Sequence, residues 1–164
     1  DDFTKLASTV ETIIVDNNVC NDPSFSRLDL QPFSCLKALE VGNYSCCYVD
    51  EVLLVGLKKL EKVVVGENSF TRKEANAGRI HNLHHEFCLK ECEELKELRV
   101  GDGSFMQYSV CEIEDVPLLE VLEIGSVLRV CRPGVEGWRR KRGVMGRHAE
   151  VAITGGGRLL LLSG

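Results

Sequence analysis

The chain has 164 residues, 44% of them apolar and 6% aromatic, and a net charge of −5. This length fits one domain with a continuous core, and no apolar run approaches the roughly 18 residues of a membrane-spanning helix, so no membrane span is predicted. Residues 1–125 hold 12 basic and 23 acidic residues, whereas residues 126–164 hold 8 and 2. The first part should repel nucleic acid and anionic surfaces, and the second should attract them.

Four segments repeat one apolar phrase that ends in glycine. They read LKALEVG at 36–42, LEKVVVG at 60–66, LKELRVG at 95–101 and LEVLEIG at 119–125. The alternation before each glycine has the period of a short half-buried strand. A second apolar alternation, twelve and fourteen residues before each glycine, predicts another strand in each repeat: Leu28 and Leu30, Val52 and Leu54, Phe87 and Leu89, Cys111 and Ile113.

An earlier, degenerate copy stands at the start of the chain, with Val10, Ile13 and Val15 in the apolar positions and Asp16 in place of glycine. The glycines are expected to supply turn angles that other residues resist. The serine three residues after each of the first three glycines is expected to bond nearby backbone. The next residue (Cys46, Phe70 or Phe105) is expected to fill the corner of the interior.

The glycines are 24, 35 and 24 residues apart, and an apolar period in the range of about 20–29 residues is typical of leucine-rich solenoids. We therefore predict a mainly β solenoid over residues 1–125, a leucine-rich-repeat array of about five coils with two short strands in each. An irregular, basic Gly/Arg-rich tail follows at 126–164.

The phrase resembles the BspA-like class of leucine-rich repeats, whose usual form has Ile-Gly-x-x-Ala-Phe after the strand. The resemblance covers roughly residues 6–125. Two departures are a serine where alanine is usual and the interval of 35 residues between Gly66 and Gly101, which is 11 residues too long. The resemblance implies a right-handed solenoid used for adhesion or protein binding, and it implies no catalytic residue.

The extra residues form a polar insertion at 71–86, and insertions in repeat proteins often lie on a binding face. The insertion contributes to a pattern of His81, His84, His85 and Cys88. Imidazole and thiolate suit zinc, but the spacing matches no closed zinc module, so we predict no metal site. Cys88 is expected to point away from the core. We interpret the insertion as a protein-contact loop, with these candidate residues: Arg79, His81, His84 and His85.

Outward positions of the predicted strands supply the other candidate contacts. Exposed apolar residues that cluster indicate a contact patch, whereas scattered ones do not. The candidates on the strands are Leu53, Val55, Val64, Arg99 and Glu123. The first three are apolar and are expected to be exposed close to one another.

Eight cysteines are scattered along the chain, and several take apolar repeat positions. A reduced cysteine behaves as a small buried hydrophobe, so reduced thiols in an intracellular protein are favoured. The alternative is a secreted or surface protein with disulfides. Because the chain begins with Asp1, we expect a fragment or a processed product, and a surface or secreted location would require an upstream signal outside the given sequence.

The predicted function is non-enzymatic: a scaffold that binds a protein partner through the sheet face and the 71–86 loop, without a cofactor. No nucleophile elbow, paired-carboxylate motif or metal signature is present in the sequence. The alternative is binding of nucleic acid or an anionic surface through the tail, which contains the basic run 139–142. The tail is expected to be disordered, to come from a shifted reading frame, or to cover the last coil with its apolar segments 151–153 and 159–162.

Overall fold

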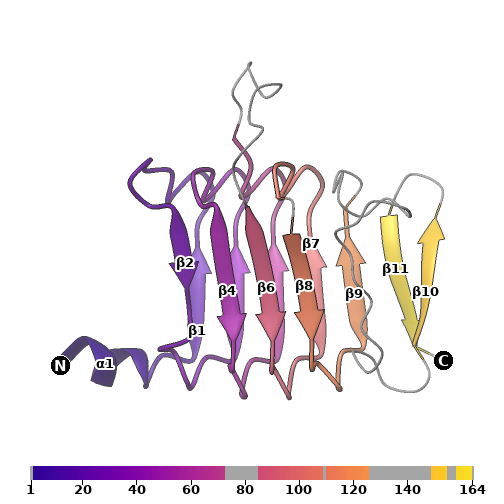
Figure 1. Ribbon diagram of the computed structural model, residues 1–164, viewed down its shortest axis with the longest axis horizontal. Helices are drawn as coiled ribbons and strands as arrows, with labels where there is room; N and C mark the ends of the chain where they lie inside the picture. The colour runs from indigo at the N-terminus through magenta and orange to yellow at the C-terminus, as the bar shows by residue number, and fades with distance from the viewer. Residues whose placement is uncertain (1, 73–84, 109, 126–148, 155–157, 164) are drawn as a thin grey trace.

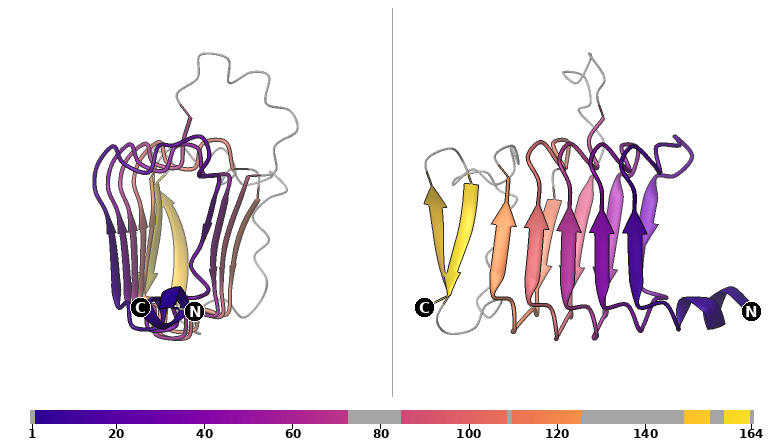
Figure 2. Two further views of the ribbon diagram at one scale, coloured as in Figure 1. Left: turned by 90° about the vertical axis from the view of Figure 1, so that its left-hand side faces the viewer. Right: turned by 180° about the vertical axis from the view of Figure 1, so that it is seen from behind.

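The structure is a computed structural model that describes residues 2–72, 85–108, 110–125, 149–154 and 158–163. It consists of one short helix and two β-sheets that face each other (Figures 1 and 2). The helix, α1 (Asp2–Ala7), has no counterpart in the sequence predictions. Among the described residues, no helix is long and apolar enough to cross a membrane.

The larger sheet, sheet A, has the strand order β1-β3-β5-β7-β9-β11-β10. Its parallel strands come from the predicted phrase, which precedes Asp16 in the first copy and a glycine in the other four: β1 (Thr12–Val15), β3 (Ala38–Val41), β5 (Lys62–Val65), β7 (Glu97–Val100) and β9 (Val121–Ile124). They pair in the register of the repeat, so that Ala38, Lys62, Glu97 and Val121 lie side by side. The predicted strand positions are therefore confirmed for sheet A.

The smaller sheet, sheet B, has the order β2-β4-β6-β8 and is parallel throughout. Its strands are the second predicted strand of each repeat: β2 (Arg27–Asp29), β4 (Glu51–Val55), β6 (Glu86–Lys90) and β8 (Val110–Glu114). The chain alternates between the two sheets, and Figure 2 shows the open layers edge-on.

The core lies between the sheets. In β3, β5 and β9 every second side chain is buried, and the same alternation holds in β4 and β8. The leucines that open each phrase are also buried: Leu36, Leu60, Leu95 and Leu119. Burial of one face of each strand is the main stabilising force of such a fold.

The four repeat glycines are needed for close approach rather than for turn angles. A Cβ atom on Gly101 would lie 2.6 Å from both the backbone carbon and the backbone oxygen of Gly66. None of the four has a positive φ; that conformation falls instead on residues such as Tyr44 and Phe70. The expectation that these glycines supply unusual turn angles is therefore wrong, because neighbouring turns pack directly against their Cα atoms.

The repeat serines tie each turn to the preceding one. Ser69 Oγ donates a hydrogen bond to the carbonyl oxygen of Gly42 at 2.6 Å and accepts one from the backbone N–H of Ser45 at 3.1 Å. Ser104 makes the same donation to Gly66 at 2.7 Å. The main partners are thus in the neighbouring repeat, although a longer bond of 3.4 Å from Ser69 Oγ to Glu67 stays within the turn.

The described part of the tail, residues 149–154 and 158–163, forms two strands, which corrects the prediction of an irregular tail for these residues. β10 (Ala149–Thr154) and β11 (Arg158–Ser163) pair with each other in antiparallel fashion, and β11 also pairs with β9. Two apolar segments separated by the short Gly-rich stretch 155–157 have the pattern of a β-hairpin. The backbone of this hairpin extends sheet A beyond β9. The basic run 139–142 lies outside the described residues.

Candidate functional site

The predicted sheet contacts fall on two different faces. Val64, Arg99 and Glu123 are neighbours on the outer face of sheet A. Leu53 and Val55 lie on β4, on the outer face of sheet B. All of these residues except Arg99 are partly buried. The three apolar candidates therefore do not form one patch, because the two strands of a repeat belong to opposite sheets.

The charges on the face of sheet A are largely paired with each other. Arg99 is hydrogen-bonded to the carboxylates of Glu97 and Glu123, and Lys62 Nζ lies 2.9 Å from Glu40 Oε1. Hydrogen bonding to Glu40 raises the pKa of Lys62. Exposed pairs of this kind contribute little to stability, and they leave few charges for a partner to recognise.

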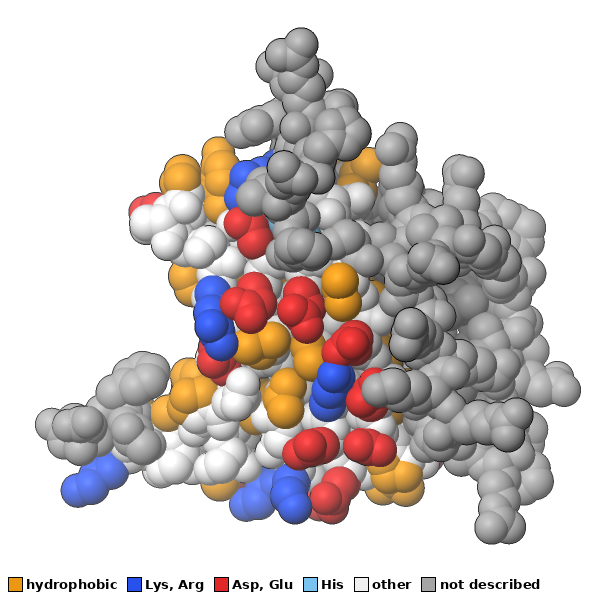
Figure 3. Space-filling model, viewed as in Figure 1, with side chains coloured by type: hydrophobic (Ala, Val, Ile, Leu, Met, Phe, Trp, Pro, Cys, Tyr) orange, Lys and Arg blue, Asp and Glu red, His pale blue; other side chains and the backbone are white. Residues whose placement is uncertain are grey.

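The face of sheet B mixes acidic, basic and apolar side chains, which Figure 3 shows over β4, β6 and β8. Near its centre, potential ligand atoms of Glu86, Cys88 and Glu112 lie within 4.8 Å of one another. Cys88 is on the outer face as predicted, but its neighbours bury it, and this burial raises the pKa of its thiol. Because the Lys90 ammonium also contacts Glu112, part of the negative charge of this group is already compensated.

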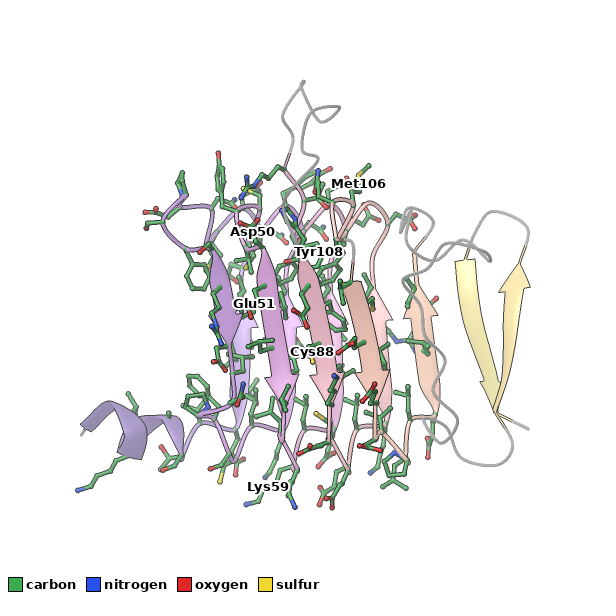
Figure 4. All side chains as sticks on the ribbon, in the orientation of Figure 1. Asp50, Glu51, Lys59, Cys88, Met106 and Tyr108 are labelled. Carbon is green, nitrogen blue, oxygen red and sulfur yellow. The ribbon has the colours of Figure 1, made fainter. Side chains whose placement is uncertain are left out.

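Arg72 and His85, which flank residues 73–84 in the sequence, belong to one polar cluster that is partly buried. Arg72 donates hydrogen bonds to both carboxylate oxygens of Asp50, at 2.8 and 3.0 Å. His85 Nε2 lies 3.2 Å from Asp50 Oδ1, and the His85 ring meets the Tyr108 ring edge to face at a centroid distance of 5.4 Å. Asp50 and Tyr108 both lie toward the upper edge of the sheets in Figure 4.

His85 therefore does not belong to an exposed contact loop, which corrects its prediction as a surface contact. Its side chain is 2% exposed because it packs between Asp50 and Tyr108. Burial lowers the pKa of His85; Asp50 opposes this shift and Arg72 adds to it. The other candidates in the insertion, Arg79, His81 and His84, lie outside the described residues.

A groove beside this cluster was not predicted from the sequence. It has a volume of about 300 Å³ and crosses three successive turns. Its lining is rich in aromatic, amide and cationic side chains: Asn18, Asn21, Tyr44, Cys47, Tyr48, Asn68, Thr71 and Arg72. The only sequence signal is the Asn and Tyr content of the turns, which is equally typical of turn formation.

Hydrogen bonds hold the walls of this turn groove in place. The Asn21 side chain donates to the carbonyl oxygen of Tyr44 at 2.9 Å and accepts from the N–H of Cys47 at 2.9 Å. The Arg72 guanidinium carbon lies 5.5 Å from the centre of the Tyr48 ring. At the far side, Thr71 Oγ1 donates to the carbonyl oxygen of Gly103 at 2.8 Å. The groove is thus preorganised by contacts between repeats.

Tyr44 is the most accessible aromatic residue of the turn groove, with 37% of its surface exposed. Tyrosine combines an apolar ring with a hydroxyl that donates and accepts hydrogen bonds. The groove therefore offers a ring surface, amide groups and one guanidinium, a combination suited to binding a peptide segment. In comparisons with protein-family models, curated proteins and solved structures, nothing matches this chain.

Proposed function

We propose that the chain is a leucine-rich-repeat protein of the BspA-like class, built as a solenoid, and that it binds a protein partner without catalysing a reaction. The in-register stacking of equivalent positions, such as Leu39 beside Val63 and Val63 beside Leu98, supports the repeat assignment. Such an array presents long surfaces to a partner. The sheet faces and the 71–86 insertion are the surfaces that the sequence pattern favours.

The turn groove is the observation that carries the binding proposal. Tyr and Arg are the residue types that most often dominate binding energy at protein interfaces, and Asn provides adaptable hydrogen bonds. Here Tyr44, Tyr48 and Arg72 line one groove of about 300 Å³ at the base of the insertion. A partner segment in the groove would contact these three side chains together.

The sheet face would then form the polar rim of the interface. The row of Val64, Arg99 and Glu123 is partly apolar, but Arg99 and Glu123 already bind each other. Rim charges affect association rate and specificity more than affinity. We therefore expect groove residues to matter more for binding than residues of the sheet face.

The test is capture of partners from a lysate of the source cells on the immobilised full chain, followed by mass spectrometry. Tyr44→Ala removes the exposed groove ring and should reduce retention of the main partner at least tenfold, which is about 1.4 kcal/mol. Leu118→Ala is the matched control, because Leu118 is also exposed, at 49%, but lies away from the groove. This control should retain the partner as the wild type does.

Equal retention by wild type and Tyr44→Ala would contradict the groove as the binding surface. A second comparison addresses the tail. If removal of residues 126–164 abolishes retention, and nuclease or higher salt releases the captured material from the full chain, the chain binds nucleic acid or an anionic surface instead.

A further inference from the structure

Cys20 and Cys46 occupy the same position in successive turns. Asp16 directly follows β1, and Cys20 lies four residues after Asp16. In the same way Gly42 directly follows β3, and Cys46 lies four residues after Gly42. Both have a left-handed backbone, with φ of 57° at Cys20 and 56° at Cys46. Because one backbone conformation is repeated in adjacent turns, the two side chains leave the chain in similar directions.

Backbone contacts hold these two turns against each other at the cysteines. The N–H of Cys46 donates to the carbonyl oxygen of Val19 at 3.1 Å, and the N–H of Cys47 donates to Asn21 Oδ1 at 2.9 Å. Cys20 is also close enough to Cys46 to contribute to the raised pKa of the Cys46 thiol. Neighbouring levels of parallel strands are about 4.8 Å apart, which falls within the Cα separation of about 4.4–6.8 Å that a disulfide requires.

The two thiols differ in access to solvent. Cys20 is exposed, so that a soluble oxidant can reach it, whereas Cys46 is 1% exposed. Burial, with a smaller contribution from Cys20, raises the pKa of Cys46 to about 12. Cys20 is therefore suited to react first and Cys46 second, because the sulfur of Cys46 is close to Cys20 but shielded from solvent.

We propose that Cys20 and Cys46 form a reversible disulfide when the chain meets a small-molecule disulfide oxidant. The Cys20 thiol loses its proton to solvent, and its sulfur attacks one sulfur of the oxidant. The S–S bond of the oxidant breaks, and the leaving thiolate takes up a proton. The Cys46 sulfur then attacks the Cys20 sulfur, the bond from Cys20 to the oxidant's sulfur breaks, and the proton of the Cys46 thiol passes to the departing thiolate, which leaves as the second thiol. Two cysteine thiols are oxidised, and the oxidant is reduced to two thiols.

The disulfide would stabilise the first repeat of the array, whose apolar side chains are less buried than those of the second repeat. Val10, Ile13 and Val15 of the first repeat are only partly buried, whereas the equivalent residues of the second repeat, among them Leu39 and Val41, are buried. Segments with fewer buried apolar contacts open most easily. A covalent link between the first two turns restrains this opening, whether or not the turn groove binds a partner.

The test is oxidation of the full chain with glutathione disulfide, followed by alkylation and tryptic digestion of the monomer band from a non-reducing gel. Trypsin places Cys20 in peptide 6–27, Cys46 and Cys47 in peptide 38–58, and Cys35 in peptide 28–37. The expected product is a linked pair of peptides 6–27 and 38–58. Oxidation should also raise Tm by roughly 5–10 °C, and dithiothreitol should reverse the rise.

Serine variants identify the two sulfurs. Cys47→Ser and Cys35→Ser should keep both the linked peptides and the Tm rise. Cys20→Ser changes an exposed residue, so it should match the reduced wild type in Tm and lose both effects. If Cys47→Ser abolishes the link, if peptide 6–27 carries only a glutathione adduct, or if the oxidised wild type shows no linked peptides, the proposal is overturned.

Discussion

Phe70 and Phe105 stack face to face, with ring centroids 4.6 Å apart and ring planes 5° apart. They take the same repeat position, and both have positive φ, at 53° and 57°. The edges of the stack are closed by Phe87 and Tyr108, whose ring centroids lie 5.2 and 4.8 Å from that of Phe105. The repeat thus concentrates aromatic side chains in one part of the core, where each pair adds to the stability gained by burial.

Removal of one ring of this stack should strongly destabilise the fold. Phe70→Ala leaves a cavity beside Phe105, and we expect the free energy of unfolding to fall by about 3–5 kcal/mol. Ile14→Ala is the control, because Ile14 is 66% exposed, and its effect should stay within about 0.5 kcal/mol. Urea unfolding followed by circular dichroism measures both. A loss below about 1 kcal/mol for Phe70→Ala would contradict the stack.

Two glycine variants separate close approach from backbone conformation. In Gly101→Ala the new Cβ would meet the backbone of Gly66 at 2.6 Å, so we expect a loss of roughly 3 kcal/mol or more. Gly56 has φ of +70° but no atom within 4 Å of an added Cβ, so Gly56→Ala should cost only about 1–2 kcal/mol. Urea unfolding again measures both changes. A larger loss for Gly56→Ala would show that turn conformation matters more than packing.

Ser69 tests the hydrogen bonds that join successive turns. Ser69→Ala removes the bond donated to Gly42 and leaves the N–H of Ser45 without its acceptor. Loss of buried partners costs about 1–3 kcal/mol. Ser24→Ala removes only an exposed bond to Asp22 and should be nearly neutral. Thermal unfolding distinguishes the two, and equal Tm values would argue against a stabilising role for these bonds.

The strands could be predicted from the sequence because each alternation of apolar and polar residues matches one buried and one outer face. Val63 and Val65 are buried, while Lys62 and Val64, which alternate with them, face outward, as the pattern requires. Because sequence period and strand geometry are directly linked, the register of the repeat followed as well. This local rule accounts for most of the predicted fold.

Features that depend on contacts between repeats could not be predicted in the same way. The packing of Gly101 against Gly66 arises only when two turns are placed side by side. His85 looked like a loop residue because its partner, Asp50, is 35 positions earlier in the sequence. The turn groove was missed for the same reason, since residues as distant as Asn18 and Arg72 line it together.

The register of sheet A can be tested with adjacent charge substitutions. Leu98 is 1% exposed, so Leu98→Asp places a carboxylate in the core and should cost more than about 4 kcal/mol, enough to unfold the chain. Arg99→Asp breaks the pairs with Glu97 and Glu123 on the outer face, and its effect on stability should be mild. Circular dichroism at 25 °C reports both outcomes, and equal effects would contradict the assignment of the two faces.

His85 should make the stability of the chain depend on pH. Its pKa is lowered in the folded protein, chiefly by burial, whereas in the unfolded chain it has the ordinary value of about 6.5. The unfolded state therefore binds a proton more readily, and the free energy of unfolding should decrease as pH falls below about 6.5. The slope from this one group is at most about 1.4 kcal/mol per pH unit.

His85→Gln should show a shallower decrease in the free energy of unfolding when both proteins are unfolded with urea between pH 7.5 and 5. Other titrating groups act in both proteins, so the difference between the two curves isolates His85. If the wild type instead gains stability over the variant as pH falls, the attraction between protonated His85 and Asp50 outweighs burial, and the direction of the pKa shift is wrong.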